Sequence, residues 1–435
     1  MARVMKDSGV AWIGEIPEGW RIGKTSLFFD IQLGKMLQPE SSSAEDSFEN
    51  YLCAANLGGN ALKMNPLRQM WFSANDRKQF AVKKGDLLVV EGGDVASCDI
   101  IREEVNDLYI QNALHRVRSK SGYSVEYLRY LLMIAKASGH IDLVCNKATI
   151  AHFTKDKFGS LAFIVSSVAE QSRIAAFLDR RCAEIDRVIA ATQRTIEEYR
   201  KLKQSIITEA VTHGVRGPRK MKDSGVEWIG EIPEEWEVTK TKSLASRIVV
   251  GVVIKPADHF SENGTVPFLR GINVKEYTIN SEPMVYITQE TNQMLSKSIV
   301  HTDDLLIVRD GSIGTACVVP DEYDGANVVS MIIVTCEKGI SPQFVCYSLN
   351  SDVGKTQFNI TKIGTALTHT SVQSVSNILH IVPPFAEQME IVKYLENRCA
   401  EIDRLIEAKQ QLLTQLEAYK KSVIYEYVTG KWEVV

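Results

Sequence analysis

Two stretches of the sequence carry residue types that belong to catalytic sites. Val382–Phe385 reads Val-Pro-Pro-Phe, which resembles the Pro-Pro-aromatic core of amino-methyltransferases. That core opens with Asn, Asp or Ser, because a polar side chain must accept a hydrogen bond from the target amine. Here the position is valine, and the first half of the chain has Ser166–Ala169 at the same place. We therefore interpret the prolines as the start of a helix.

The second stretch, Gly354–Thr356, reads Gly-Lys-Thr as in a phosphate-binding loop. Such a loop needs a glycine six residues before the lysine so that backbone amides can surround phosphate, and Leu349 stands there instead. Gly92–Asp94 and Gly311–Gly314 follow strand-like runs, but no Gly-x-Gly-x-x-Gly accompanies them. They are more typical of tight turns beside a binding surface.

Cysteines and histidines also lack the spacing of a reactive site. No Cys-x-x-Cys pair occurs, no cysteine lies beside a histidine at metal-ligand spacing, and the eight histidines are scattered. The eight cysteines are Cys53, Cys98, Cys145, Cys182, Cys317, Cys336, Cys346 and Cys399. We expect buried, reduced thiols, and no catalytic centre, metal or cofactor on this chain.

An internal repeat organises the rest of the sequence. Met5–Trp20 reads MKDSGVAWIGEIPEGW and Met221–Trp236 reads MKDSGVEWIGEIPEEW, a match at 14 of 16 positions. Arg181–Arg187 reads RCAEIDR, and Arg398–Arg404 reads the same. Between these anchors the halves diverge, although Gly85-Asp86-Leu87-Leu88 faces Asp303-Asp304-Leu305-Leu306 and His152 faces His369.

The segments that end each half are predicted to be long helices. From about Glu170 to Thr212, apolar residues recur at alternating spacings of four and three, and the second copy does the same. Ser167 and Glu170 suit a capping box, while Gly214 and Gly430 follow the ends. Each helix should run about 43 residues, or roughly 64 Å. We expect the two helices to pair antiparallel with approximate two-fold symmetry; the alternative is that each packs only on its own domain.

The regions between the anchors predict mixed α/β domains. Short apolar runs at Asp86–Val90, Asp304–Val308 and Val328–Thr335 alternate with a helical stretch at Val125–Ala137. With 435 residues, 45% apolar and 24% charged, we expect at least two globular domains. No window is apolar over the length of a membrane span, so we expect a soluble, intracellular protein. The net charge of −4 means that any basic face must be local.

These features together resemble one family. The opening Met5–Trp20, its recurrence at Met221, and the Glu-Gln-x-x-Ile-x-x-x-Leu helix entries at Glu170 and Glu387 are similar to type I restriction specificity subunits. The repeated Ala-Glu-Ile-Asp that follows strengthens the resemblance, which covers essentially the whole chain.

The resemblance implies an α/β fold with two target recognition domains that read a split site in double-stranded DNA, at residues 1–168 and 215–385, and two spacer helices, at 169–214 and 386–435. It also implies docking of two methyltransferase subunits, joined by restriction subunits in the full complex. S-adenosylmethionine, ATP and magnesium would then belong to those partners, in a bacterial or archaeal cytoplasm.

Candidate contact residues follow from position and residue type. DNA contacts are expected from the loops before each shared helix, from strand arginines and from a turn after a strand, because arginine suits guanine edges and phosphates. They are Arg116, Arg118, Lys147, Thr149 and His152 in the first domain, and Arg270, Arg309, Ser312, Lys362, Thr365, His369 and Thr370 in the second. The expected docking residues on the helices are Arg181, Glu184, Asp186, Arg187, Arg398, Glu401, Asp403 and Arg404.

Two other functions are compatible with the same residues. One is a scaffold whose paired helices hold two domains that bind ligands other than DNA. The other is a self-contained methyltransferase or nuclease. Lack of salt-dependent DNA affinity would favour the scaffold, and binding of S-adenosylmethionine by the purified chain would favour the enzyme.

Overall fold

A computed structural model describes residues 3–145, 151–253, 255–363 and 369–434. The chain forms two compact units. Unit 1 comprises Met1–Thr192 and Gln411–Val435, and unit 2 comprises Gln193–Gln410. Each unit therefore contains one globular part, the beginning of the long helix that follows it, and the end of the other long helix.

The main sheet has the same strand order in both units. In unit 1 the order is β10 (Cys98–Ile100), β9 (Leu87–Val90), β12 (Leu114–Ser119) and β4 (Phe29–Leu33). In unit 2 it is β23 (Ala316–Val318), β22 (Leu305–Val308), β25 (Met331–Cys336) and β17 (Ala245–Val250). Neighbouring strands pair antiparallel throughout both sheets. The predicted mixed α/β domains are thus two copies of one topology.

A second, three-stranded sheet also recurs. Its order is β11 (Leu108–Ile110), β5 (Ser47–Leu52) and β8 (Arg68–Phe72) in unit 1, and β24 (Asn327–Val328), β18 (Val266–Leu269) and β21 (Tyr286–Ile287) in unit 2. The central strand pairs parallel with the first and antiparallel with the last in both units.

The remaining strands form two-stranded pairs, again in matching places. These are β1 (Met5–Asp7) with β2 (Glu15–Pro17), β3 (Arg21–Lys24) with β13 (Ala162–Val165) and β6 (Leu57–Gly58) with β7 (Ala61–Leu62) in unit 1, and β14 (Met221–Asp223) with β15 (Glu231–Pro233), β16 (Glu237–Lys240) with β26 (Leu379–Val382) and β19 (Val274–Lys275) with β20 (Thr278–Ile279) in unit 2.

The strand predictions are confirmed in two places and wrong in a third. β9 and β22 lie within the predicted runs, and each has four successive buried residues because both faces of the strand are covered. The run Val328–Thr335 is not one strand. Ser330 has a φ of 50°, and this left-handed residue separates β24 from β25.

One helix of each globular part packs on the main sheet: α3 (Val125–Ala137), with the predicted bounds, and α9 (Pro342–Asn350). Ser124 and Ser341 cap them by accepting a backbone N–H, as N-cap serines do. The other short helices are α1 (Thr25–Phe28), α2 (Ala74–Phe80), α4 (His140–Cys145), α5 (Lys155–Ser160), α7 (Thr241–Leu244), α8 (Gln289–Met294), α10 (Asp352–Ile363) and α11 (Val372–Ser376).

The repeated opening motif fastens the start of each long helix. Trp20 donates its indole N–H to Glu170 at 3.1 Å, and Trp236 donates to Glu387 at the same distance. The next residue of each helix, Gln171 or Gln388, accepts the backbone N–H of the serine that caps α3 or α9. The Trp and Glu-Gln signatures recur because in each unit they make the same hydrogen bonds, from Trp to Glu and from the capping serine to Gln.

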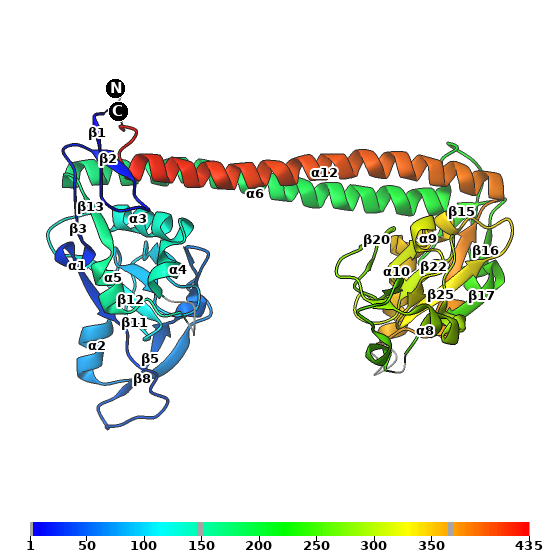
Figure 1. Cartoon of the computed structure of the whole chain (residues 1–435), viewed down its shortest axis with the longest axis horizontal. Helices are drawn as coiled ribbons and strands as arrows, with labels where there is room; N and C mark the ends of the chain where they lie inside the picture. Colours follow the sequence, from blue (N-terminus) through cyan, green and yellow to red (C-terminus); the bar gives the residue numbers. More distant parts are fainter. Residues whose placement is uncertain (1–2, 146–150, 254, 364–368, 435) are drawn as a thin grey trace. The chain divides into compact units, whose positions relative to one another are not determined.

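The two long helices are α6 (Val168–His213), with 46 residues, and α12 (Phe385–Val428), with 44, close to the predicted length (Figure 1). The first part of the predicted seam is buried in both copies, and most of its other positions are partly buried, as expected for apolar side chains at alternating spacing in a helix pair. Those buried positions include Leu178, Cys182 and Ile185 of α6, and Leu395, Cys399 and Ile402 of α12.

Ion pairs show that the helices run antiparallel. In unit 1, Lys420 of α12 pairs with Asp186 of α6 at 2.6 Å. In unit 2, Lys203 of α6 pairs with Asp403 of α12 at 2.7 Å. The residue number on α12 falls as that on α6 rises, and the two pairs are equivalent by the repeat. The helices therefore contact each other as well as their own domains.

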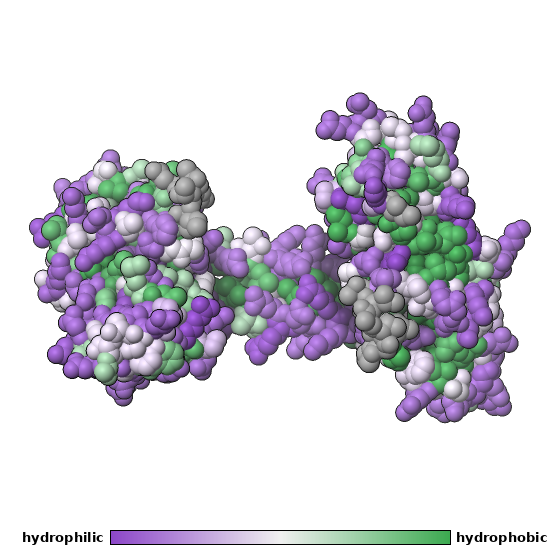
Figure 2. Space-filling model, turned by 90° about the horizontal axis from the view of Figure 1, so that it is seen from below, coloured by the Kyte–Doolittle hydropathy of each residue, from purple (hydrophilic) through white to green (hydrophobic). Residues whose placement is uncertain are grey.

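All eight cysteines are free thiols, and all but the half-buried Cys336 are buried. The described residues contain no cluster suited to a metal ion and no helix long and apolar enough to cross a membrane. Figure 2 shows one face of the molecule, where apolar patches lie between polar side chains.

Candidate functional site

A hairpin loop in each unit is held by the same backbone hydrogen bonds. Between β9 and β10, Val90 donates to Ser97 O at 2.9 Å and Ala96 donates to Val90 O at 3.0 Å. Between β22 and β23, Val308 donates to Thr315 O and Gly314 donates to Val308 O at the same two distances. The loops 91–97 and 309–315 thus share one backbone frame.

The chain that precedes each long helix is fastened to this loop. In unit 1, His152 forms a bridge with Gly92, and Phe153 donates its amide to Glu91 O at 2.7 Å. In unit 2, His369 bridges Asp310, and Thr370 donates to Arg309 O at 3.1 Å. We call each combination, 91–97 with 151–153 and 309–315 with 369–371, the hairpin-loop surface of its unit.

The side chains on the unit 1 surface are acidic. His152 Nδ1 lies 3.0 Å from the Glu91 carboxylate, and the histidine ring is about half exposed. Asp94 pairs with Lys136 at 2.5 Å and accepts from Ser97. Although partial burial alone would raise the pKa of Asp94, these hydrogen bonds lower it, so the carboxylate stays charged.

The unit 2 surface has a different chemistry on the same frame. Arg309 takes the place of Glu91, and its Nε is buried without a hydrogen-bond acceptor among the described residues. Asp310 accepts from Ser330 Oγ at 2.6 Å, and Ser312 is exposed at the tip of the loop. This surface can donate hydrogen bonds where that of unit 1 accepts them.

Two of the arginines predicted for the first domain are engaged by the fold. Arg116 is 7% exposed, donates to the carbonyls of Gln79 and Ala81, and has its pKa lowered by burial. Arg118 donates two hydrogen bonds to the Asp86 carboxylate, at 2.6 and 2.7 Å, and these raise the pKa of Arg118. Both lie on β12 and point to the segment before β9, away from the loop 91–97. Lys147 and Thr149 lie outside the described residues.

The structure brings most of the second domain's predicted residues together. Gly271, which follows Arg270, lies beside Val308 and Asp310, so Arg270 is near the hairpin-loop surface that holds Arg309, Ser312, His369 and Thr370. Arg270 donates to Pro283 O at 2.8 Å. The Thr370 hydroxyl is buried without a partner among the described residues. Lys362 is near the end of α10, and Thr365 lies outside the described residues.

The predicted helix residues separate into two groups. Six of them form ion pairs inside the helix pair: Arg181 with Glu184, Arg398 with Glu401, and Asp186 and Asp403 with the lysines of the other helix. Arg187 and Arg404 are exposed, next to the exposed apolar residues Val188 and Leu405. Only this second group leaves its charged ends free on the described surface.

Glu91 and Asp310 were missed by the sequence reasoning. Both follow a buried strand, as Arg309 does, and alignment of the two halves through β9 and β22 would have paired Glu91 with Arg309.

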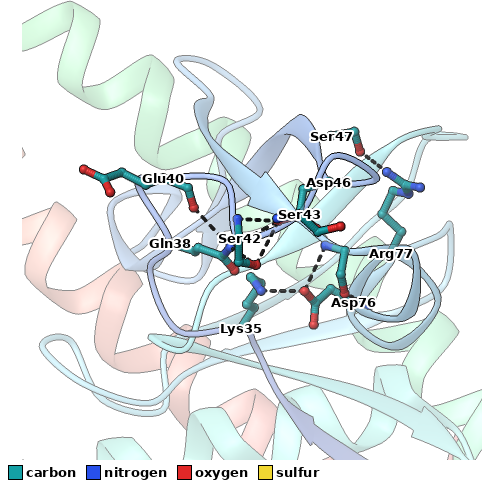
Figure 3. A network of polar contacts seen from close by, with 10 residues as sticks. Lys35, Gln38, Glu40, Ser42, Ser43, Asp46, Ser47, Asp76 and Arg77 are labelled. Carbon is teal, nitrogen blue, oxygen red and sulfur yellow. Dashed lines mark hydrogen bonds and ion pairs between the residues drawn. The ribbon is translucent and has the colours of Figure 1, made fainter.

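A polar network in unit 1 joins the loop 35–47 to helix α2 (Figure 3). Asp46 accepts from the amides of Ser42 and Ser43, and the Ser42 amide is the largest cause of its lowered pKa. Lys35 pairs with Asp76 at 2.5 Å, and Asp76 also caps α2. Asp46 and Asp76 accept these hydrogen bonds from donors of the protein itself, so the network holds the loop 35–47 in place.

Comparison with known proteins decides what the two similar units are. The family described as "Type I restriction modification DNA specificity domain" matches residues 17–198 and 233–418, once for each half of the chain. The chain belongs to this family. It is therefore a specificity subunit, the DNA-recognition component of a type I restriction-modification system, and not a catalytic one.

Named relatives of this specificity subunit agree along its length. It is 25% identical to the type I restriction enzyme MjaVIII specificity subunit of Methanocaldococcus jannaschii, over 96% of this chain and 94% of that one. It is 21% identical to the EcoBI specificity subunit of Escherichia coli, over 66% and 61%.

Solved structures agree on the fold of the specificity subunit. A chain described under assembly and conformational transition of the type I restriction-modification system matches with a TM-score of 0.74 and 13% identity, over 96% of this chain and 99% of that one. The HsdS subunit of Thermoanaerobacter tengcongensis matches with a TM-score of 0.50 and 13% identity, over 96% and 98%.

Proposed function

We propose that each unit reads one half of a split DNA site through its hairpin-loop surface. The observation that carries this proposal is the shared backbone frame with different side chains: Glu91 and His152 on one copy, and Arg309 and Ser312 on the other. A protein that reads two different half-sites with two similar domains needs the same backbone geometry in both domains but different side chains on the surfaces that contact DNA.

The chemistry of these side chains suits base edges in the major groove. Arginine donates to guanine O6 and N7, and a carboxylate accepts from the amino group of cytosine. Arg309, with Arg270 nearby, therefore fits guanine or phosphate, whereas Glu91 fits cytosine. Seven further residues are proposed to complete the two surfaces: Lys147, Thr149, His152, Lys362, Thr365, His369 and Thr370. Arg116 is left out, because its guanidinium is buried and held by backbone carbonyls.

The helices are proposed to dock two methyltransferase subunits, one at each copy of the repeat. Arg187 with Val188, and Arg404 with Leu405, give the same exposed pair of a cation and an apolar side chain on both helices. S-adenosylmethionine, ATP and magnesium would act on the partner subunits, and restriction subunits would join for cleavage. We place this assembly in the cytoplasm, where the DNA that it methylates is found.

Co-expression with the neighbouring methyltransferase gene tests the function. Sequencing that maps methylated adenines in host DNA should find a split motif that disappears when this chain is omitted. The matched control is the chain with the residues of both hairpin loops replaced by glycine and serine, which should still form the complex but lose the motif. Methylation that is unchanged when the chain is omitted, with no complex recovered, would favour the non-DNA scaffold.

A further inference from the structure

Unit 1 contains an apolar pocket of about 590 Å³ between the end of α3 and the last turns of α12. Aromatic and aliphatic side chains form much of its wall, among them Trp12, Met133, Ile424 and Tyr425. The indole N–H of Trp12 is buried and has no hydrogen-bond acceptor among the described residues. The turn between β6 and β7 contributes Asn60 to the wall.

In unit 2 the position equivalent to Asn60 is Tyr277. Each is the second residue of the two-residue turn in a small hairpin, β6–β7 or β19–β20, and each has a positive φ, 60° for Asn60 and 70° for Tyr277. The Tyr277 ring packs against that of Tyr347 of α9 at a tilt of 35°, with centroids 4.9 Å apart, and Lys203 of α6 lies over the Tyr277 ring. In unit 2 an aromatic ring thus lies between the globular part and the shared helix.

Direct contacts also join these elements in unit 2. Gln204 of α6 donates to Asn350 O at 2.9 Å and accepts from Lys355 at 2.9 Å. The equivalents of Gln204 and Asn350 in unit 1 are Lys421 and Met133, which line opposite sides of the pocket. Unit 1 therefore leaves open a space that unit 2 closes with its own side chains.

The rim of the pocket is basic. Lys421 is exposed and has no carboxylate partner among the described residues, whereas Lys136 is held by Asp94 and Ser97. Lys431 lies over the ring of Tyr425, 4.7 Å from its centroid. A ligand for this site should thus combine an aromatic group with a negative charge beside it.

We propose that the pocket receives an aromatic side chain, flanked by an acidic residue, from the methyltransferase subunit that docks on unit 1. The inference rests on the proposed docking function. It makes the two docking sites different, because in unit 2 the side chain of Tyr277 already occupies the equivalent space. Aromatic side chains that enter a pocket carry a large share of the binding free energy at protein interfaces. A tyrosine matches both the shape that Tyr277 occupies and the unpaired donor of Trp12.

The variant Asn60→Tyr tests the proposal by filling the pocket from within. Tyr277 shows that tyrosine adopts this backbone conformation in the equivalent turn. The matched control is Asn60→Gly, which also tolerates positive φ and also loses the hydrogen bond from the Cys98 amide to the Asn60 side chain, but leaves the pocket open. Both full-length chains are titrated with the purified methyltransferase subunit in a calorimeter.

Asn60→Tyr should weaken binding of one methyltransferase equivalent at least tenfold, while Asn60→Gly should bind as the unchanged chain does. Equal affinities of the two variants would overturn the proposal. If Asn60→Tyr does not fold, Lys421→Glu serves instead: it should weaken the same equivalent severalfold, and Lys421→Gln should weaken it less. Equal binding by these two would also overturn it. Failure of the unchanged chain to bind any methyltransferase would contradict the proposed function itself. Failure of the pocket proposal and failure of the proposed function can therefore be distinguished.

Discussion

The hairpin-loop surfaces and the helix seam diverge to different extents between the two halves of the chain. The loops 91–97 and 309–315 keep the same backbone hydrogen bonds but exchange Glu91 for Arg309. The seam keeps its ion pairs as well as its backbone, because Lys420–Asp186 and Lys203–Asp403 are equivalent pairs. Charged side chains are retained where both copies make the same internal contact, and they change on the surfaces that we propose to read different half-sites.

The largest expected effect comes from exchanging the variable part of one unit. Replacing residues 240–383 with the corresponding segment of a relative should change one half of the methylated motif and reduce methylation of the original site at least about 100-fold, since each mismatched base pair costs about 1–3 kcal/mol. Mapping of methylated adenines measures this. The reciprocal exchange of residues 24–166 is the control and should change the other half. A change in both halves, or in neither, would contradict the assignment of one half-site to each unit.

Removal of the glutamate that fastens each long helix should destabilise unit 2 more than unit 1. Glu387 is buried and bound by Trp236 and Arg219, so Glu387→Ala should cost about 3–5 kcal/mol in that unit. Glu170 is partly exposed, and Glu170→Ala should cost about 1–2 kcal/mol in unit 1. Hydrogen exchange of the α9 and α3 amides measures each unit by itself. Equal losses of stability in the two units would show that burial of the carboxylate does not determine the cost of removing it.

Arg309→Ala should act on one half-site only. Loss of a base contact by arginine costs about 1–3 kcal/mol and relaxes specificity at a single position. Fluorescence titration of the methyltransferase complex with duplexes substituted at each base pair measures this. Lys338→Ala, in a turn outside the hairpin-loop surface, is the control. If Arg309→Ala weakens all duplexes equally, Arg309 contacts phosphate and not a base.

Acid should destabilise unit 2 through His380. This residue is fully buried between Thr241 and Ser348, and burial lowers its pKa to about 4. The unfolded chain takes up a proton near pH 6.5 and the folded chain does not, so stability is unaffected above that pH and falls below it. From pH 7 to 5 the loss is about 2 kcal/mol.

His380→Gln keeps a hydrogen-bonding side chain that does not titrate, and it should remove most of this acid dependence in unit 2. The position equivalent to His380 in unit 1 is Phe163, which does not titrate. The pH dependence of unit 1 should therefore be the same in the unchanged chain and in His380→Gln. Hydrogen exchange at the two pH values, corrected for intrinsic exchange rates, measures both units. An unchanged pH dependence of unit 2 would assign the effect to other groups.

The smallest expected effect is in the seam. Double-mutant cycles on Lys203 with Asp403, and on Lys420 with Asp186, should each give about 0.2–1 kcal/mol, because the aspartates are more than half exposed. The two values should agree and should fall in 1 M salt. Clearly different values would mean that the two copies of the seam are not energetically equivalent.

The sequence predicts best the features whose physical cause is local or repeated. Helix periodicity and caps predicted α3, α6 and α12 closely, and buried apolar runs predicted β9 and β22. The run 328–335 was not recognised as two strands, because the left-handed Ser330 leaves no signal in an apolar segment. The ion pairs of the helix aspartates were not predicted, because their lysine partners lie 200 and 234 residues away in the chain.

The structural role of a strand arginine was harder to predict than the helices and strands. A strand arginine looks the same in the sequence whether it faces solvent or a backbone carbonyl. Arg116 and Arg118 are held by Ala81 and Asp86, which come together with β12 only in the folded sheet. Arg309 differs because it directly follows its strand, in the loop itself.

The division of unit 1 between the two ends of the chain bears on its synthesis. Val423, Ile424 and Val428 belong to its core, and Tyr127 donates to Val428 O at 2.6 Å. These residues leave the ribosome only after all of Gln193–Gln410. At roughly 5–20 residues per second, the domain translated first waits about 10–40 s for its last helix. Nascent chains should therefore expose the apolar face of α3 for that time, which makes unit 1 the part most dependent on chaperones.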